Sequence, residues 1–148
     1  MTTLKARITD DMKSALKAGE QMRLHTVRLA LSEIRRYEAD KGAEPDEATS
    51  LAILEKMVKQ RRDSESQFRA GNRPDLADKE AAEIAILLAY MPQQLTEAEV
   101  MALIEQGKSE TGAAGARDMG KLMAWLKPKA AGRTDMGKLS ALVKAGLG

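Results

Sequence analysis

The amino-acid sequence predicts an all-α protein, with a four-helix N-terminal domain followed by a small three-helix C-terminal domain. Apolar residues recur three and four positions apart along most of the chain, which is the period of an amphipathic helix. No stretch alternates apolar and polar residues for long enough to indicate a strand. Aromatic residues make up only 3% of the chain, so Leu, Ile, Met and Ala must fill the core.

Four helices are expected in the N-terminal domain, and turn signals separate them. Gly19 follows the first helix, and a turn from Lys41 to Pro45 follows the second. Asp46 can cap the third, and Pro74 suits the first turn of the fourth. The expected helices are Leu4–Ala18, residues 20–40, residues 46–68 and Pro74–Met91.

The boundary between the two domains is expected near Pro92. A proline closes the fourth helix, because the residue before it avoids the helical conformation. Thr96-Glu-Ala-Glu99 has the pattern of a capping box and opens a fifth helix. We therefore place the N-terminal domain at residues 1–92 and the C-terminal domain at residues 96–148.

An internal repeat lies in the C-terminal domain. Gly115-Ala-Arg-Asp-Met-Gly-Lys-Leu122 returns seventeen residues later as Gly132-Arg-Thr-Asp-Met-Gly-Lys-Leu139. Both copies contain the Gly-x-x-x-x-Gly-Lys pattern of a phosphate-binding P-loop. Leu122 and Leu139 stand where a P-loop needs Ser or Thr, and no apolar strand precedes either copy. Nucleotide hydrolysis is therefore not expected.

Each repeat is expected to begin a short amphipathic helix, with a loop from Pro128 to Thr134 between the two. Asp118 and Asp135 are placed to cap the amides of the first turns. A glycine disfavours a helix by roughly 1 kcal/mol relative to Ala, so Gly120 and Gly137 suggest that another helix or a ligand comes close. The apolar stripes are Met119, Leu122, Met123 and Leu126 in the first copy, and Met136, Leu139 and Val143 in the second.

Positive charge is concentrated at the C-terminal end. The whole chain has a net charge of +2, but residues 117–148 carry seven Lys or Arg and two Asp or Glu. A basic segment of this kind engages nucleic acid or another polyanion, although it can also dock on the acidic residues 71–116 or simply be solvated. The candidate phosphate contacts are Arg117, Lys121, Lys127, Lys129, Arg133, Lys138 and Lys144.

The residue types argue against catalysis by this chain alone. Cysteine is absent and His25 is the only histidine, which excludes Cys/His nucleophiles and thiolate or two-histidine metal sites. No cofactor or metal is expected. Glu80 and Glu83 share one helix face, where salt bridges to the preceding helix are favoured over a paired-carboxylate hydrolase. The basic partners would be Lys59, Arg61 and Arg62.

Three further features bear on location and partners. His25 is expected to be solvated, and Trp125 is expected to pack in the core or an interface, with base stacking as the alternative. The start of the chain shows no signal-peptide run, and no segment approaches the roughly 18 apolar residues of a membrane span. We expect a cytoplasmic protein without a membrane partner.

Five ordered motifs together resemble the GatB/YqeY family, over nearly the whole chain. The usual Tyr-Leu-Pro of the family is here Tyr90-Met-Pro92, and the second repeat mirrors the first more closely than the family usually shows. The motifs are Lys59-Gln-Arg61, Gly71-x-Arg73-x-Asp75-Leu-Ala-x-Lys-Glu80, Tyr90-Met-Pro92, Asp118-Met-Gly-Lys-Leu-Met123 and Gly132-Arg-x-Asp135.

The resemblance implies a stand-alone version of the C-terminal region of the GatB subunit of the tRNA-dependent amidotransferase. That enzyme makes Gln-tRNA or Asn-tRNA from the mischarged Glu or Asp forms, and in it this region helps to hold tRNA. Other parts of the complex carry the kinase and transamidation chemistry. The resemblance also implies the label of a carbon–nitrogen ligase with glutamine as amido donor.

Three functional hypotheses follow. The first is a non-catalytic RNA-binding module for tRNA or other structured RNA. The second is a protein-interaction adaptor, in which an apolar groove around Met119, Met123 and Trp125 holds a partner helix, an amidotransferase or a synthetase. The third is an accessory ligase subunit, active only with its partners.

Overall fold

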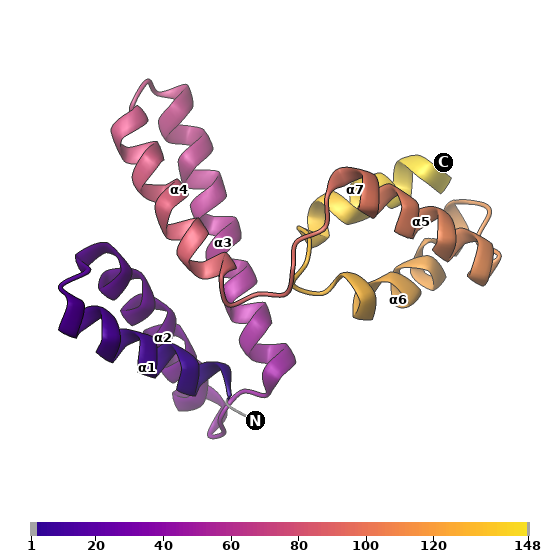
Figure 1. The fold of residues 1–148 in the computed structure, drawn as a ribbon. Helices are drawn as coiled ribbons and strands as arrows, with labels where there is room; N and C mark the ends of the chain where they lie inside the picture. The colour runs from indigo at the N-terminus through magenta and orange to yellow at the C-terminus, as the bar shows by residue number, and fades with distance from the viewer. Residues whose placement is uncertain (1–2, 148) are drawn as a thin grey trace. The chain divides into compact units, whose positions relative to one another are not determined.

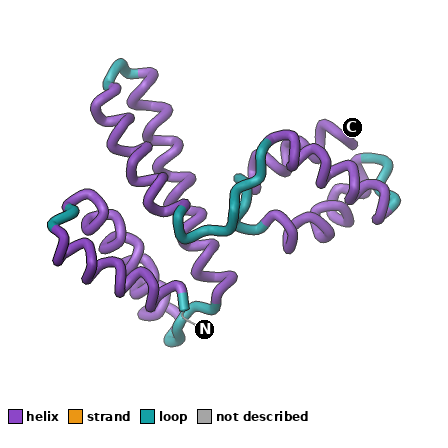
Figure 2. The backbone as a smooth tube through the Cα atoms, in the orientation of Figure 1, coloured by secondary structure: helices purple, strands orange, loops and turns teal. Residues whose placement is uncertain are grey.

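The structure is a computed structural model that describes residues 3–147. Over those residues it contains seven α-helices, one short 3₁₀ helix and no strand, as Figure 2 shows, so the predicted all-α class is confirmed. Backbone contacts divide the chain into two compact units, Met1–Met91 and Pro92–Gly148. The two units are described separately below.

The first unit is built from two helical hairpins, in which α1 packs along α2 and α3 packs along α4 (Figure 1). Each of the three connecting turns contains a left-handed residue, a conformation that glycine and asparagine tolerate. These are Gly19 (φ 72°), Gly42 (φ 68°) and Asn72 (φ 57°). The helices are α1 (Leu4–Ala18), α2 (Gln21–Lys41), α3 (Glu47–Ala70) and α4 (Pro74–Leu88).

The predicted start signals of α3 and α4 are confirmed. The Asp46 carboxylate accepts a hydrogen bond from the amide of Thr49 at 2.8 Å, which lowers the pKa of Asp46. Pro74 occupies the first turn of α4, where its missing N–H leaves no helical bond unmade. Local sequence therefore sets where both helices begin.

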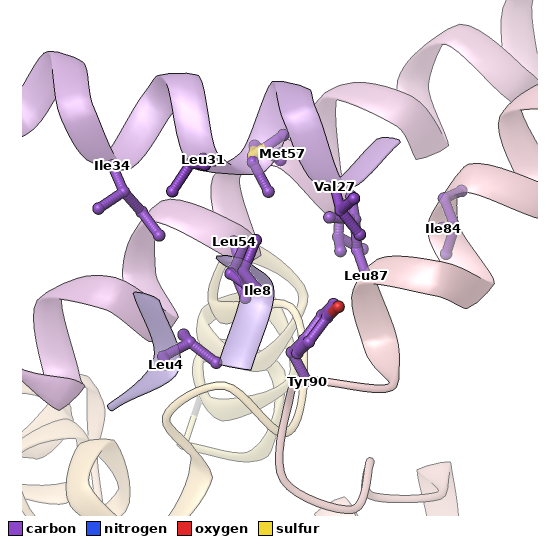
Figure 3. Close-up of a cluster of buried hydrophobic side chains, with 12 residues drawn as sticks. Leu4, Ile8, Val27, Leu31, Ile34, Leu54, Met57, Ile84, Leu87 and Tyr90 are labelled. Carbon is purple, nitrogen blue, oxygen red and sulfur yellow. The ribbon is translucent and has the colours of Figure 1, made fainter. Parts of the chain in front are cut away.

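The core of the first unit joins all four helices. Leu4 and Ile8 from α1 and Val27, Leu31 and Ile34 from α2 lie in one cluster with side chains of α3 and α4, as the close-up in Figure 3 shows. These side chains recur three or four positions apart, so each helix presents one apolar face to the others. The remaining buried residues of the cluster are Ala30, Leu54, Met57, Val58, Ile84, Leu87 and Tyr90.

Two predicted helix ends in this unit were wrong. The fourth helix stops at Leu88 rather than Met91, and the amides of Tyr90 and Met91 bond three residues back instead of four. Pro92 explains this tightening, because a proline disfavours the helical conformation at the residue before it. The third helix continues to Ala70, two residues beyond the predicted end at Phe68.

The second unit has three helices and one 3₁₀ turn around its own apolar cluster. The capping box at its start is confirmed, because the Thr96 hydroxyl accepts from the Glu99 amide while the Glu99 carboxylate accepts from the Thr96 amide. These bonds hold the pKa of Glu99 below its usual value. The elements are α5 (Glu97–Thr111), η1 (Ala116–Asp118), α6 (Met119–Ala130) and α7 (Met136–Leu147). The buried cluster is Val100, Ile104, Ala113, Leu122, Leu126, Ala130, Leu139, Val143 and Leu147.

The predicted loop from Pro128 to Thr134 was wrong at its start, because α6 continues through Pro128 to Ala130. Proline removes one amide donor, but the next turn is closed by the amide of Ala131, which donates to the carbonyl of Lys127 at 2.9 Å. Burial of Ala130 favours this extra turn, because it places a core residue beyond the proline.

Candidate nucleic-acid interface

The position of α6 is set by a close approach at Gly107 in α5. A Cβ added to Gly107 would lie 2.7 Å from the Leu122 side chain and 2.7 Å from the Trp125 ring. Only glycine therefore fits between α5 and α6 at this level. At Gly120 no other helix comes close, because nothing lies within 4 Å of the position its Cβ would take, so the helix-packing explanation was wrong there. Gly120 faces solvent instead.

Trp125 packs inside the second unit, as the packing interpretation expected. It is half-buried against the core cluster, and its indole N–H donates to the Glu110 carboxylate at 3.0 Å. The ammonium of Lys129 lies 4.0 Å from the centre of its ring, in a cation–π contact. With these partners, Trp125 fixes α6 against α5.

The two repeat aspartates have different roles in spite of their matching surroundings. Asp135 caps α7 as predicted, since its carboxylate accepts from the amides of Gly137 (2.8 Å) and Lys138 (3.2 Å). The predicted side-chain cap at Asp118 was wrong. Its carboxylate accepts from the amide of Ala114 at 3.0 Å, and the 3₁₀ helix η1 leads directly into α6.

The segment before α5 is attached to the loop between α6 and α7. The side chain of Gln94 donates to the carbonyl of Gly132 at 2.7 Å, and the amide of Leu95 donates to the carbonyl of Arg133 at 2.8 Å. The Arg133 guanidinium donates in return to the carbonyl of Gln93 at 3.0 Å. These bonds hold the ends of α6 and α7 to the start of the unit.

The repeat is longer than eight residues, and it includes both the buried and the exposed faces of α6 and α7. Residues 118–127 match residues 135–144 at seven of ten positions, in a fixed offset of seventeen. The buried positions correspond, with Leu122 opposite Leu139 and Leu126 opposite Val143. The exposed positions are identical in the two copies: Gly120, Lys121, Ala124 and Lys127 on α6, and Gly137, Lys138, Ala141 and Lys144 on α7.

Six of the seven predicted phosphate contacts are exposed, and for five of these the structure shows no side-chain ion pair or hydrogen bond over residues 3–147. The other two are engaged within the unit, Lys129 on the Trp125 ring and half-buried Arg133 at the carbonyl of Gln93. The five free cations are Arg117 on η1, Lys121 and Lys127 on α6, and Lys138 and Lys144 on α7.

Sequence reasoning did not identify Ala124, Ala141 or Gly107. The two alanines were detectable, because extending the repeat alignment by five residues brings Ala124 and Lys127 into register with Ala141 and Lys144. The close approach at Gly107 had no sequence signal, since a glycine inside α5 carries no indication of which side chain lies beside it.

The predicted salt bridge at Glu83 is present in the first unit. The Arg61 guanidinium donates to the Glu83 carboxylate at 3.2 Å, and Glu83 is only 5% exposed. His25, predicted to be solvated, is indeed exposed, but its Nε2 lies 3.9 Å from the other carboxylate oxygen of Glu83. This carboxylate therefore joins three helices. Over residues 3–147, no group of three His, Cys, Asp or Glu side chains is placed to hold a metal ion.

The chain belongs to the YqeY-like family, whose model matches residues 5–147. This family occurs as stand-alone proteins and in the C-terminal region of GatB, so the resemblance noted from the motifs is confirmed. None of the helices described between residues 3 and 147 is long and apolar enough to cross a membrane.

Relatives of the chain are found among yeast proteins named "Altered inheritance of mitochondria protein 41, mitochondrial". The chain is 31% identical to the one from Vanderwaltozyma polyspora over 78% of its own length and 66% of that protein. It is 32% identical to the one from Lachancea thermotolerans over 81% of its own length and 68% of that protein. The chain thus spans about two thirds of the length of these relatives.

Proposed function

We propose that this protein is a non-catalytic RNA-binding module that contacts tRNA or another structured RNA through the exposed faces of α6 and α7. The observation that carries the proposal is the repeated exposed pattern Gly-Lys-x-x-Ala-x-x-Lys, in which an alanine lies between the two lysines. Buried positions repeat in any pair of similar core helices, but the exposed positions need not. Identity on the exposed face indicates that both helices meet the same kind of partner.

The geometry suits a phosphate backbone. Lys121 and Lys127 lie about 9 Å apart along the axis of α6, and Lys138 and Lys144 have the same spacing on α7. The small residue between each pair leaves room for a sugar–phosphate chain to lie against the helix. Because the structure shows no ion pair for these four lysines, none needs to be released before a phosphate binds.

Lysine side chains, rather than helix amides, are the proposed phosphate contacts. The N-terminus of a helix attracts anions when its first amides are free. At α7 the amides of Gly137 and Lys138 already donate to Asp135, whose negative charge would also repel a phosphate. The proposal therefore concerns a side-chain surface and not a P-loop.

Membership of the YqeY-like family supports a tRNA as the partner, because the family includes the C-terminal region of an enzyme that acts on charged tRNA. On this proposal, the carbon–nitrogen ligase label describes the complex and not this chain. The chain itself would contribute RNA binding to an amidotransferase or synthetase partner.

The test is the fluorescence anisotropy of labelled bulk tRNA, with duplex DNA as competitor. A Lys121→Glu/Lys138→Glu variant should weaken tRNA binding about tenfold or more, because two phosphate contacts become repulsive. Lys13→Glu/Lys17→Glu makes the same change in net charge on exposed positions of α1 and should have little effect. Equal losses in the two variants would show that net charge alone is responsible.

The adaptor hypothesis makes a different prediction. Trp125, which was expected to line the apolar groove, is half-buried against the core cluster and already contacts Glu110 and Lys129 within the unit. If a protein partner captured from a cell extract survives nuclease treatment and tRNA does not bind, the RNA proposal is wrong and the adaptor hypothesis gains support.

A further inference from the structure

A small pocket in the first unit lies outside the proposed RNA surface. It is an open pocket with a volume of about 310 Å³, lined by residues of α1, α2 and the end of α4. Ile86, Ala89 and Tyr90 supply apolar lining, and Arg7 and Arg23 supply two positive charges. The sixth lining residue is Asp11.

The negative charge in this pocket already has partners. The Tyr90 hydroxyl donates a hydrogen bond to the Asp11 carboxylate, and Arg23 lies 3.6 Å from the same carboxylate. Burial raises the pKa of Tyr90, and the bond to Asp11 raises it further, so the tyrosine stays a neutral donor at physiological pH. Two arginines against one carboxylate leave the lining with a net positive charge.

The donors of the arginines are incompletely used. Arg23 interacts with the Tyr90 hydroxyl and makes ion pairs at 3.6 Å to both Asp11 and Glu20, and these ion pairs are longer than a charge-assisted hydrogen bond of about 2.7–2.9 Å. The Arg7 guanidinium lies 5.5 Å from the centre of the Tyr90 ring, and this contact leaves most of its five N–H donors for another acceptor. A guanidinium offers paired donors that match the oxygens of a phosphate or carboxylate.

We propose that this pocket binds a small organic oxyanion, with its phosphate or carboxylate group on Arg7 and Arg23 and its apolar body on Ile86, Ala89 and Tyr90. The volume is near the lower limit of small-molecule sites and exceeds what an inorganic phosphate would fill. The ligand therefore needs an apolar part beside its charge. This site is independent of the proposed RNA surface, because its lining comes from the first unit alone.

Phenyl phosphate is a suitable probe, because it combines a phosphate with an apolar ring. It should be titrated into the full-length ¹⁵N-labelled protein at constant ionic strength, with the amide shifts of Ala89 and Tyr90 as the readout. The proposal requires saturable shifts and about tenfold tighter binding than either inorganic phosphate or phenol shows alone. Benzoate in place of phenyl phosphate distinguishes a carboxylate from a phosphate preference.

Substitution of the arginines decides whether the pocket is responsible. Arg7→Gln and Arg23→Gln should each weaken binding about tenfold, the expected loss of one charge-assisted contact. Arg28→Gln removes an exposed arginine of α2 that does not line the pocket and should leave binding unchanged. Shifts that never saturate, or equal losses in all three variants, would overturn the proposal. Unshifted amides far from the pocket will verify that each variant is folded.

Discussion

At the scale of single residues, Gly107 and Gly120 differ in the space beside their α-carbons. A Cβ added at Gly107 would lie 2.7 Å from the Leu122 and Trp125 side chains, closer than van der Waals contact, whereas Gly120 has open space. Both lie in helices, where glycine is less favourable than alanine by roughly 1 kcal/mol. The same substitution should therefore have opposite effects at the two positions.

Gly107→Ala should lower the free energy of unfolding by about 1–3 kcal/mol, because the new methyl group forces α5 and α6 apart. Gly120→Ala is the matched control and should raise it by up to about 1 kcal/mol. Urea denaturation followed by Trp125 fluorescence measures both. A neutral Gly107→Ala would mean that α5 and α6 are packed less closely than described.

Tyr90 should make the free energy of unfolding of the first unit fall at alkaline pH. Its pKa is raised above 10.0 in the folded protein by burial and by the hydrogen bond to Asp11. The unfolded chain therefore loses the proton first. The contribution of Tyr90 to the free energy of unfolding is therefore fully present below about pH 10. It is lost as the pH rises toward the pKa of Tyr90 in the folded protein.

Tyr90→Phe should remove that dependence. Between pH 9 and pH 11.5, the free energy of unfolding of the wild type should fall more steeply than that of the variant, while Tyr37 contributes equally to both. Urea titrations at several pH values supply the comparison. Parallel pH profiles would show that the Tyr90 hydroxyl has no perturbed ionisation.

The repeat also shows how far single residues could be predicted from the sequence. Asp118 and Asp135 precede the same Met-Gly-Lys-Leu sequence, so the local sequence predicts that both aspartates cap the helix that follows. Only Asp135 does so. The difference comes from the preceding residues, since the chain before Asp118 turns back as η1 and offers the amide of Ala114. Only the tertiary path of the chain decides between these hydrogen bonds.

At the scale of the elements, Arg61 and Glu83 form an ion pair that connects α3 to α4. Their side chains are only 14% and 6% exposed. Glu83→Gln leaves the buried guanidinium without a counter-charge and should destabilise the protein by about 2–3 kcal/mol. The double variant Arg61→Met/Glu83→Leu should recover part of that loss, because no charge remains buried.

Thermal and urea unfolding of this double variant and of its two single variants, Arg61→Met and Glu83→Leu, forms a double-mutant cycle. If the loss of stability in the double variant equals the sum of the losses in these two single variants, the pair does not interact. The salt bridge itself could be predicted, because Glu83 lies on a helix that follows a run of basic residues. The approach of His25 from α2 could not, since it depends on the packing of α2 against α4.

Helix ends were the least predictable part of the elements. Apolar spacing predicted all seven helices described between residues 3 and 147, because each buries one face. The predicted helix end at Pro128 was wrong, because α6 continues to Ala130 although proline removes one amide donor, and the amide of Ala131 still donates to the carbonyl of Lys127. Burial of Ala130 in the core also favours the longer helix, and this tertiary contact cannot be predicted from the local sequence.

At the scale of the whole molecule, we propose that the two compact units are domains that fold independently. The N-terminal boundary of the second should be Pro92 rather than Thr96, since Gln93, Gln94 and Leu95 bond to the loop between α6 and α7. A fragment of residues 92–148 should be helical and unfold cooperatively. A fragment of residues 96–148 should be less stable by about 1–3 kcal/mol, the contribution of these hydrogen bonds.

Circular dichroism during urea denaturation compares the two fragments. Equal stability would mean that residues 92–95 are a simple linker. A fragment of residues 92–148 that stays unfolded would contradict the independence of the second unit.

The most direct test of RNA binding by α6 and α7 is the salt dependence of tRNA affinity. On a plot of the logarithm of the tRNA binding constant against the logarithm of the salt concentration, the slope is negative. It should become shallower by about 0.7–0.9 for each lysine that no longer neutralises a phosphate. The Lys121→Gln/Lys127→Gln/Lys138→Gln/Lys144→Gln variant should therefore have a slope shallower by about three than that of the wild type. An unchanged slope in this variant, or a flat salt response in the wild type, would show that these helix faces do not bind the RNA backbone.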